Sequence, residues 1–241
     1  MIESASPARE ISEADLEVCA AVGRLDAGWY CSGVLVHPRL VLTAGHSGPL
    51  GGFPLPRAVA LRMADLRDTA GADVIEGQFT AHEAYAGKGA CDIGALLLDR
   101  DSEVTPVALA TTAETADATE VTLAGFGACL EARGRGLTLR RTATVPIRHF
   151  SAGPLRLPRE TAGCIRFDPD LEFLAGVEEA GPCFGDSGGP AFITVNGRRK
   201  LAGIISRPAA RQKPFCRGLA ILTRIDAFQD WIRSRSCAPP A

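Results

Sequence analysis

The most informative stretch of this 241-residue chain is Gly181-Pro182-Cys183-Phe184-Gly185-Asp186-Ser187-Gly188-Gly189-Pro190. Because glycine lacks a Cβ, such a segment can form a tight, strained turn that exposes one hydroxyl and brings backbone N–H groups close to a bound molecule. A flexible Gly/Ser loop is the alternative interpretation, but the order Gly-Asp-Ser-Gly-Gly is more particular than a linker. The stretch therefore predicts that Ser187 acts as a nucleophile.

A serine hydroxyl becomes an effective nucleophile only when a base removes its proton. An imidazole held by a buried carboxylate suits that task near neutral pH. The surroundings of Ser187 match the G-x-S-x-G pattern of α/β-hydrolases, in which the acid and then the histidine follow the serine. The histidines of this chain are His37, His46, His82 and His149. None follows Ser187, so that order is excluded and the base must precede the nucleophile.

Two upstream residues are the candidates for base and acid. His46 stands at the end of a predicted strand, where a surface histidine is the alternative interpretation. Asp92 leads directly into the apolar run that begins at Ile93, where a turn aspartate is the alternative. An acid at the entrance of a buried strand needs a hydrogen-bond partner, which favours a functional role. The order His46, Asp92, Ser187 is the one that chymotrypsin has.

Three motifs carry a family resemblance and occur in order along the chain. They are Thr43-Ala44-Gly45-His46, Asp92-Ile93-Gly94-Ala95-Leu96-Leu97 and Gly185-Asp186-Ser187-Gly188-Gly189-Pro190. With secondary matches such as Cys31-Ser32-Gly33-Val34-Leu35 and Asp230-Trp231-Ile232, they extend over residues 16–235. Together they resemble the chymotrypsin-like (trypsin-family) serine peptidases, of the bacterial type. The resemblance implies an enzyme, a serine endopeptidase that hydrolyses peptide bonds through an acyl-enzyme intermediate.

The resemblance also implies an all-β fold with two antiparallel six-stranded Greek-key β-barrels, the active site between them, and a C-terminal helix. The sequence pattern agrees, since short β-branched runs are broken by Gly and Pro. We expect an N-terminal barrel at residues 1–112, a C-terminal barrel at 113–225, and a helix and tail at 226–241, with Asp226 as helix cap. The patternless segment 113–118 is expected to link the halves. Strands are predicted at 16–25, in a hairpin at 29–45, and at 58–63, 74–81, 93–98, 120–125, 137–147, 163–167, 191–195, 200–206 and 218–225.

Carried over residue by residue, the resemblance gives each candidate a role. Ser187 would attack the substrate carbonyl, His46 would move the proton and Asp92 would orient His46. The backbone N–H groups of Gly185 and Ser187 would form the oxyanion hole. Ser206 matches the serine that supports the buried aspartate.

The specificity pocket implied by the resemblance differs from that of trypsin. Its residues are Gly181, Phe184, Arg207, Pro208 and Ala220. Gly181 stands six residues before Ser187, where trypsin has the aspartate that selects Arg or Lys. An apolar residue before the scissile bond is therefore expected, although basic residues at 207–217 could favour an acidic one. Pro208 has no N–H with which to bind the substrate backbone.

The cysteines depart from the family pattern. Ser47 replaces the cysteine that would bond to Cys31, and Leu174 and Ile193 replace two others, so that only the disulfide Cys183–Cys216 is expected to remain. Unmatched thiols favour a reducing compartment such as the bacterial cytoplasm, or secretion if a leader was removed. The eight cysteines lack C-x-x-C spacing, so no metal is expected, and the chemistry requires no cofactor.

Asp186 raises the question of activation. In the family, the carboxylate before the nucleophile forms an ion pair with a newly freed N-terminus. Ile2 is the best candidate for that terminus, if Met1 is lost, and Ile11 is a poorer one. The alternative is that Asp186 has another partner and that no zymogen cleavage is needed.

Composition limits the partners. The formal net charge is −2, which gives no reason to expect nucleic acid, and no run of about 18 apolar residues predicts a membrane span. A protein or peptide substrate is expected, for a monomer or for a part of a larger regulated system. A catalytically inactive pseudo-peptidase acting as a binding module, or an esterase on the same fold, is the alternative function.

Overall fold

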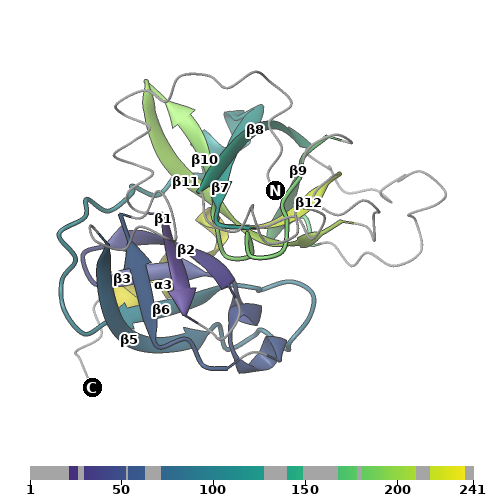
Figure 1. The fold of residues 1–241 in the computed structure, drawn as a ribbon. Coiled ribbons are helices and arrows are strands. Elements are labelled where there is room, and N and C mark those ends of the chain that lie inside the picture. The colour runs from purple at the N-terminus through teal and green to yellow at the C-terminus, as the bar shows by residue number, and fades with distance from the viewer. Residues whose placement is uncertain are drawn as a thin grey trace.

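The computed structural model describes residues 22–26, 30–52, 54–62, 72–127, 140–148, 168–177, 181–209 and 218–236. In these residues, antiparallel strands form two closed six-stranded barrels (Figure 1). The first contains β1 (Val22–Asp26), β2 (Tyr30–His37), β3 (Leu40–Thr43), β4 (Ala58–Leu61), β5 (Asp73–Ala81) and β6 (Gly94–Leu98). The second contains β7 (Glu120–Gly125), β8 (Arg141–Arg148), β9 (Glu172–Ala175), β10 (Pro190–Val195), β11 (Arg198–Pro208) and β12 (Ala220–Arg224).

The strand order confirms the predicted architecture. The first barrel closes in the order β1-β2-β3-β6-β5-β4 and the second in the order β10-β11-β12-β9-β8-β7. In each barrel the fourth strand pairs with the first, which gives the Greek-key order 4-1-2-3. Strands such as β8 alternate between buried and exposed positions, as expected where one face covers a core. The domain boundaries at residues 112 and 225 stay predictions.

Three details differ from the sequence-based expectations. The ninth strand is β9, which shows no alternation because all four of its residues are buried; the predicted strand 163–167 lies outside the described residues. The segment 113–118 is not patternless, because α2 (Thr112–Asp117) forms there with a capping box between Thr111 and Glu114. Asp226 does not cap a helix: it is the first residue of the 3-10 helix η4 (Asp226–Phe228) and forms an ion pair with Arg224.

A tight hairpin joins two of the strands predicted for the C-terminal barrel. Asn196 and Gly197 join β10 to β11 and both have positive φ, of 50° and 75°, as a two-residue type I′ turn requires.

The C-terminal helix α3 (Gln229–Ser236) returns to the first barrel. Trp231 Nε1 donates to Glu83 Oε2 at 2.8 Å, and Arg235 forms an ion pair with the same carboxylate. The ring of His82 lies 5.1 Å from that of Phe228 and 5.2 Å from that of Trp231. The end of the chain thus ties the second half of the sequence to the first barrel.

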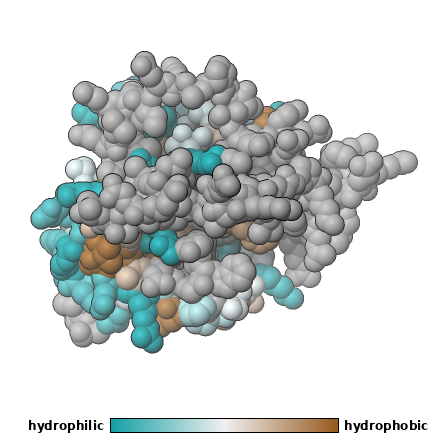
Figure 2. Space-filling model, in the orientation of Figure 1, coloured by the Kyte–Doolittle hydropathy of each residue, from teal (hydrophilic) through white to brown (hydrophobic). Residues whose placement is uncertain are grey.

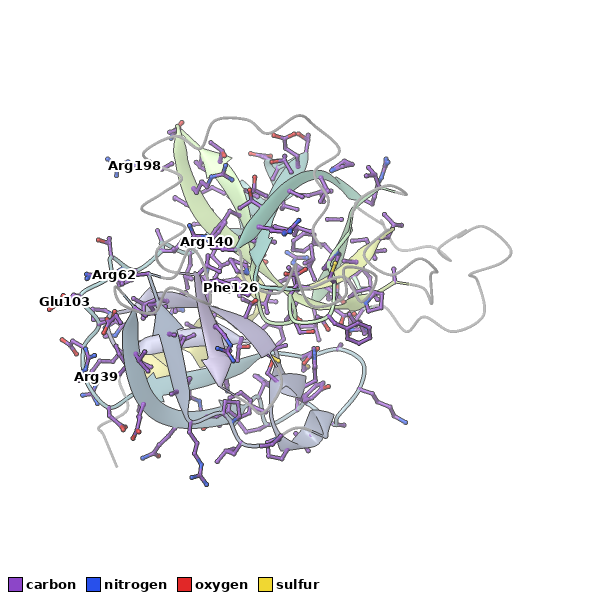
Figure 3. The ribbon with its side chains drawn as sticks, viewed as in Figure 1. Arg39, Arg62, Glu103, Phe126, Arg140 and Arg198 are labelled. Carbon is purple, nitrogen blue, oxygen red and sulfur yellow. The ribbon has the colours of Figure 1, made fainter. Side chains whose placement is uncertain are left out.

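One apolar core runs through the first barrel and across the junction. It includes Phe126 and Phe192 from the second half of the chain, and Figure 3 shows Phe126 between the two barrels. A second core fills the C-terminal barrel. Leu50 and Val74 are among the large apolar side chains that are exposed in the described residues, and Figure 2 shows apolar residues beside hydrophilic ones on this face. Isolated residues of this kind are normal for a soluble surface.

Candidate active site

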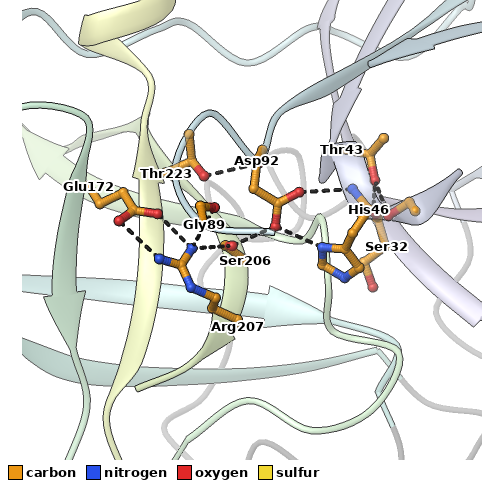
Figure 4. Close-up of polar contacts among 10 residues, drawn as sticks. Ser32, Thr43, His46, Gly89, Asp92, Glu172, Ser206, Arg207 and Thr223 are labelled. Carbon is orange, nitrogen blue, oxygen red and sulfur yellow. Dashed lines mark hydrogen bonds and ion pairs between the residues drawn. The ribbon is translucent and has the colours of Figure 1, made fainter. Parts of the chain in front are cut away.

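His46 and Asp92 meet because their strands are neighbours. His46 lies in the short 3-10 helix η1 (Gly45–Ser47) directly after β3, and Asp92 lies just before β6, which pairs with β3. His46 Nδ1 is 2.7 Å from Asp92 Oδ2, and the backbone N–H of His46 donates to Asp92 Oδ1 at 2.8 Å (Figure 4). Both carboxylate oxygens are therefore engaged by one histidine, which fixes the ring and favours the tautomer with its proton on Nδ1.

The second barrel also holds Asp92. Ser206 Oγ on β11 donates to Asp92 Oδ2 at 2.5 Å, and Thr223 Oγ1 on β12 donates to the Asp92 carbonyl at 2.9 Å. Burial acts to raise the pKa of Asp92, but the hydrogen bond and charge of His46, with the bond from Ser206, outweigh it and lower that pKa below its ordinary value. The carboxylate therefore stays ionised at the junction of the barrels.

Ser187 lies in a loop that is bonded to both barrels. Its carbonyl accepts from Ser32 N–H on β2 at 2.8 Å. The N–H of Gly188 donates to Ile205 O on β11, and the N–H of Ile205 donates to Gly189 O, both at 2.8 Å. Gly185 and Gly188 have φ of 94° and 79°. A Cβ at Gly188 would overlap Thr43 Oγ1 and the Ser32 carbonyl, so this position requires glycine for space as well as for conformation.

Ser32 is a residue that sequence reasoning missed. It is fully buried, and its Oγ donates to Gly185 O at 2.8 Å while accepting from Phe126 N–H at 3.0 Å. With its backbone N–H bonded to the Ser187 carbonyl, Ser32 connects the first barrel to two positions of the loop that carries Ser187. The only sequence signal was a hydroxyl in the motif Cys-Ser-Gly-Val-Leu.

Asp186 is fully buried and bonded to the backbone. Its Oδ1 accepts from Gly127 N–H and its Oδ2 from Cys183 N–H, each at 2.8 Å. Burial raises the pKa of Asp186, although these hydrogen bonds oppose the change. The candidate termini Ile2 and Ile11 lie outside the described residues, so the expected activation ion pair stays a prediction.

The residues of the predicted specificity pocket differ in exposure, and the pocket itself stays a prediction. Gly181 and Ala220 are buried, Pro208 is exposed, and the Phe184 side chain is 57% exposed. Arg207, expected as a cation that attracts acidic substrates, instead forms an ion pair with Glu172, with Nη1 2.6 Å from Oε1 and Nη2 3.0 Å from Oε2. Glu172 is almost completely buried, and sequence reasoning missed it.

The family pattern predicted that Cys31 has no disulfide partner and that only Cys183 and Cys216 form a disulfide. Cys31 and Cys91 are free, and burial raises the pKa of each. Ser47, which replaces the partner of Cys31, is buried, and its Oγ lies 3.2 Å from Thr43 Oγ1. Cys216 lies outside the described residues, so the disulfide Cys183–Cys216 stays a prediction.

No group of three or more His, Cys, Asp or Glu side chains in the described ranges could hold a metal ion. Within the same ranges, no helix has the length and apolar character needed to cross a bilayer.

Comparisons with known proteins complete the description. The family model described as Trypsin matches residues 11–232. A trypsin-like protease of Streptomyces glaucescens is 30% identical over 179 residues, which cover 73% of this chain and 64% of that protein. A trypsin of Saccharopolyspora erythraea is 28% identical over 211 residues, covering 85% of this chain and 86% of that protein. The solved structure of human heparin binding protein superposes with a TM-score of 0.68 at 21% identity, covering 93% of this chain and 95% of that one, which shows the shared fold.

Proposed function

The chain belongs to the trypsin family of serine peptidases, and from this premise we propose that Ser187, His46 and Asp92 form its catalytic triad. Membership makes it a serine endopeptidase, a hydrolase that acts on proteins or peptides. The observation that carries the proposal is the hydrogen bonding of both Asp92 oxygens by His46, with Ser206 as a further donor.

In the proposed mechanism, Ser187 Oγ bonds to the substrate carbonyl carbon while His46 Nε2 takes the hydroxyl proton. The electron pair of the C=O bond moves to oxygen, where the N–H groups of Gly185 and Ser187 stabilise it. The C–N bond then breaks, and the proton passes from His46 to the leaving amine. Water repeats the sequence on the acyl-enzyme and releases the acid. Asp92 stabilises the imidazolium during acylation and during deacylation, and it does not itself take the proton.

For specificity, we propose an apolar residue before the scissile bond. Gly181 carries no charge that would select Arg or Lys, and the charge of Arg207 is compensated by Glu172. A preference for acidic residues therefore has less support than the sequence suggested. In a panel of peptide anilides, we expect Phe or Leu at this position to be cleaved at least about ten-fold faster than Arg or Glu, a discrimination of the size that pocket contacts give. Fastest cleavage after Glu would contradict the assignment.

A fluorophosphonate probe tests the triad. Such a probe reacts with an activated serine, so we expect labelling of the native protein and none of Ser187→Ala. A native protein that is folded but not labelled would support a binding module instead. Cleavage of a peptide library, compared with hydrolysis of simple esters, separates a peptidase from an esterase. The contact between His46 Nδ1 and Asp92 Oδ2 supports a catalytic enzyme over an inactive binding module.

A further inference from the structure

Arg207 and Glu172 form an ion pair next to the proposed triad. Arg207 lies on β11 directly after Ser206, and its two terminal nitrogens bond to the two carboxylate oxygens of Glu172 on β9. The Glu172 side chain is fully buried, and Glu172 Oε2 also accepts from the backbone N–H of Asp168 at 3.0 Å. We call Arg207 and Glu172 the buried ion pair. A charge in such a place is stable only while its partner remains.

The guanidinium also contacts both barrels. Arg207 Nη1 lies 3.1 Å from Ser206 Oγ and 3.1 Å from the Gly89 carbonyl (Figure 4). Gly89 belongs to the segment of the first barrel that leads to Asp92. Arg207 therefore joins the strand that carries Ser206 to the segment that delivers Asp92.

The hydrogen count fixes the direction of the next bond. A guanidinium can only donate, so Ser206 Oγ accepts from Arg207. Arg207 Nη1 has two hydrogens for Glu172 Oε1, the Gly89 carbonyl and Ser206 Oγ, so two of these acceptors share one hydrogen. A hydroxyl has a single hydrogen, and that of Ser206 is then left for Asp92 Oδ2, 2.5 Å away. A donated bond from a cation also polarises the hydroxyl and strengthens the bond it makes in turn. The chain of bonds runs from Arg207 through Ser206 and Asp92 to His46 Nδ1.

Among the described residues near Asp92, one phenol and two thiols are neutral near pH 7. Tyr85 is buried, and burial with the charge of Asp92 raises its pKa far above the usual range. Burial also raises the pKa of the Cys31 and Cys91 thiols. Beyond the buried ion pair lies Asp168, whose carboxylate accepts from a neighbouring backbone N–H and acts on Cys91. In the part of the chain that the structure describes, the charged side chains that join this chain of hydrogen bonds to Asp92 are therefore Arg207 and Glu172.

We propose that Arg207 is a positioning residue for the proposed triad, and that Glu172 holds it and cancels its charge. The inference rests on the proposed function, because it assigns a role relative to Asp92 and His46. Arg207 aims the Ser206 hydroxyl at Asp92 and fixes the segment around Gly89. Glu172 prevents the guanidinium charge from acting on the imidazole.

The test uses charge changes of opposite sign. In Arg207→Met, the remaining carboxylate favours imidazolium, so the acid limb of kcat/KM moves to higher pH. In Glu172→Gln, the remaining guanidinium disfavours imidazolium, so the acid limb moves to lower pH. The double variant returns toward the native profile. Arg207→Met also lowers kcat about ten-fold, the equivalent of one lost charge-assisted hydrogen bond.

The chain offers a matched control. Arg224 on β12 forms a similar two-bond pair with Asp226, with side-chain exposure of 24% against 25% for Arg207. Its side chain bonds to Asp226 and to the Pro169 carbonyl, and neither belongs to the proposed triad. Arg224→Met should lower the melting temperature comparably and leave the pH profile unchanged.

The outcomes separate the two proposals. Labelling of the native protein by the fluorophosphonate probe is measured first, and its absence overturns both. If labelling occurs but the two single variants shift the acid limb in the same direction, or not at all, only the role of the buried ion pair is overturned. If Arg207→Met does not fold, Arg207→Lys replaces it. Lysine keeps the positive charge, so the acid limb of kcat/KM in Arg207→Lys should match that of the native protein. The acid limb in Glu172→Gln should still move to lower pH. A shift in Arg207→Lys, or none in Glu172→Gln, overturns the role.

Discussion

Asp92 and Asp186 are both buried aspartates beside the same proposed site, yet they are held in different ways. Asp92 is bonded by the side chains of His46 and Ser206 and by one backbone N–H. Asp186 is bonded by the backbone N–H groups of Gly127 and Cys183. The pKa of Asp92 is lowered, because the contacts with His46 and Ser206 outweigh burial. The pKa of Asp186 is raised, because burial outweighs its backbone contacts.

The difference divides the proposed site into two halves. The acid–base half depends on which side chains are present, since its donors are imidazole, hydroxyl and guanidinium groups. The nucleophile half depends mainly on backbone conformation, since most of its donors are peptide N–H groups, Ser32 Oγ being a side-chain donor, and its geometry requires glycine at 188. Substitutions should therefore act on the acid–base half through chemistry and on the nucleophile half through shape.

Asp92→Asn should break the acid–base half and give the largest effect. An amide removes the charge that stabilises the imidazolium and favours the wrong tautomer of His46, and the corresponding change in a Ser-His-Asp peptidase lowers kcat about 10⁴-fold. We expect a similar loss here, measured by steady-state kinetics on an apolar peptide substrate. The melting temperature controls for folding. A loss below about ten-fold in a folded variant would contradict the role of Asp92.

Gly188→Ala should break the nucleophile half through shape. The added Cβ overlaps backbone and side-chain oxygens in a residue with φ of 79°, so the loop must move. A displacement of about 1 Å near the chemistry can cost about 100-fold in rate, and the strained conformation about 1–3 kcal/mol in stability. The control is Gly197→Ala, which has a similar φ of 75° but open space around it. Kinetics and thermal unfolding should show lost stability in both variants and lost rate in Gly188→Ala alone.

Ser32→Ala tests whether the Ser32 hydroxyl supports the nucleophile half of the site or only the stability of the fold. It removes the donor to Gly185 O and the acceptor of Phe126 N–H. We expect kcat to fall about ten-fold with little change in KM, and stability to fall by about 1–3 kcal/mol because buried groups lose their partners. Ser102→Ala is the matched control, since Ser102 Oγ donates to Asp73 and accepts from Val104 N–H far from the site. Equal kcat values in the two variants would show that Ser32 is purely structural.

The two halves also differ in how well the sequence predicted them. The chain order of His46, Asp92 and Ser187 was legible because short local motifs specify each, and the barrels followed from family resemblance and strand pattern. The structure brings His46 and Asp92 together as expected. Glu172 and Arg207 were not paired in advance, because they are 35 residues apart and no local pattern links them.

Some local features were also missed for physical reasons. Strand β9 is buried on both faces and therefore lacks the alternation that identifies a strand. Helix α2 did carry a signal, the capping box of Thr111 and Glu114, but six Ala/Thr-rich residues are too short to show a helical apolar period. The importance of Ser32 depends on a contact with Gly185, 153 residues away.

The smallest effect is on the pH dependence of stability, where the two aspartates should act in opposite directions. Because the pKa of Asp92 is lowered on folding, its contribution to stability is present above its unfolded pKa and is lost as pH falls through the folded one. Because the pKa of Asp186 is raised, its contribution is present at low pH and is lost as pH rises through the folded value. Urea unfolding between pH 3 and pH 8, a range chosen on reference carboxyl pKa values of about 4, should show this. Relative to the native protein, Asp92→Asn should gain stability as pH falls, and Asp186→Asn should gain stability as pH rises. Parallel plots of unfolding free energy against pH for the two variants would mean that the two carboxylates do not differ in the way their donors imply.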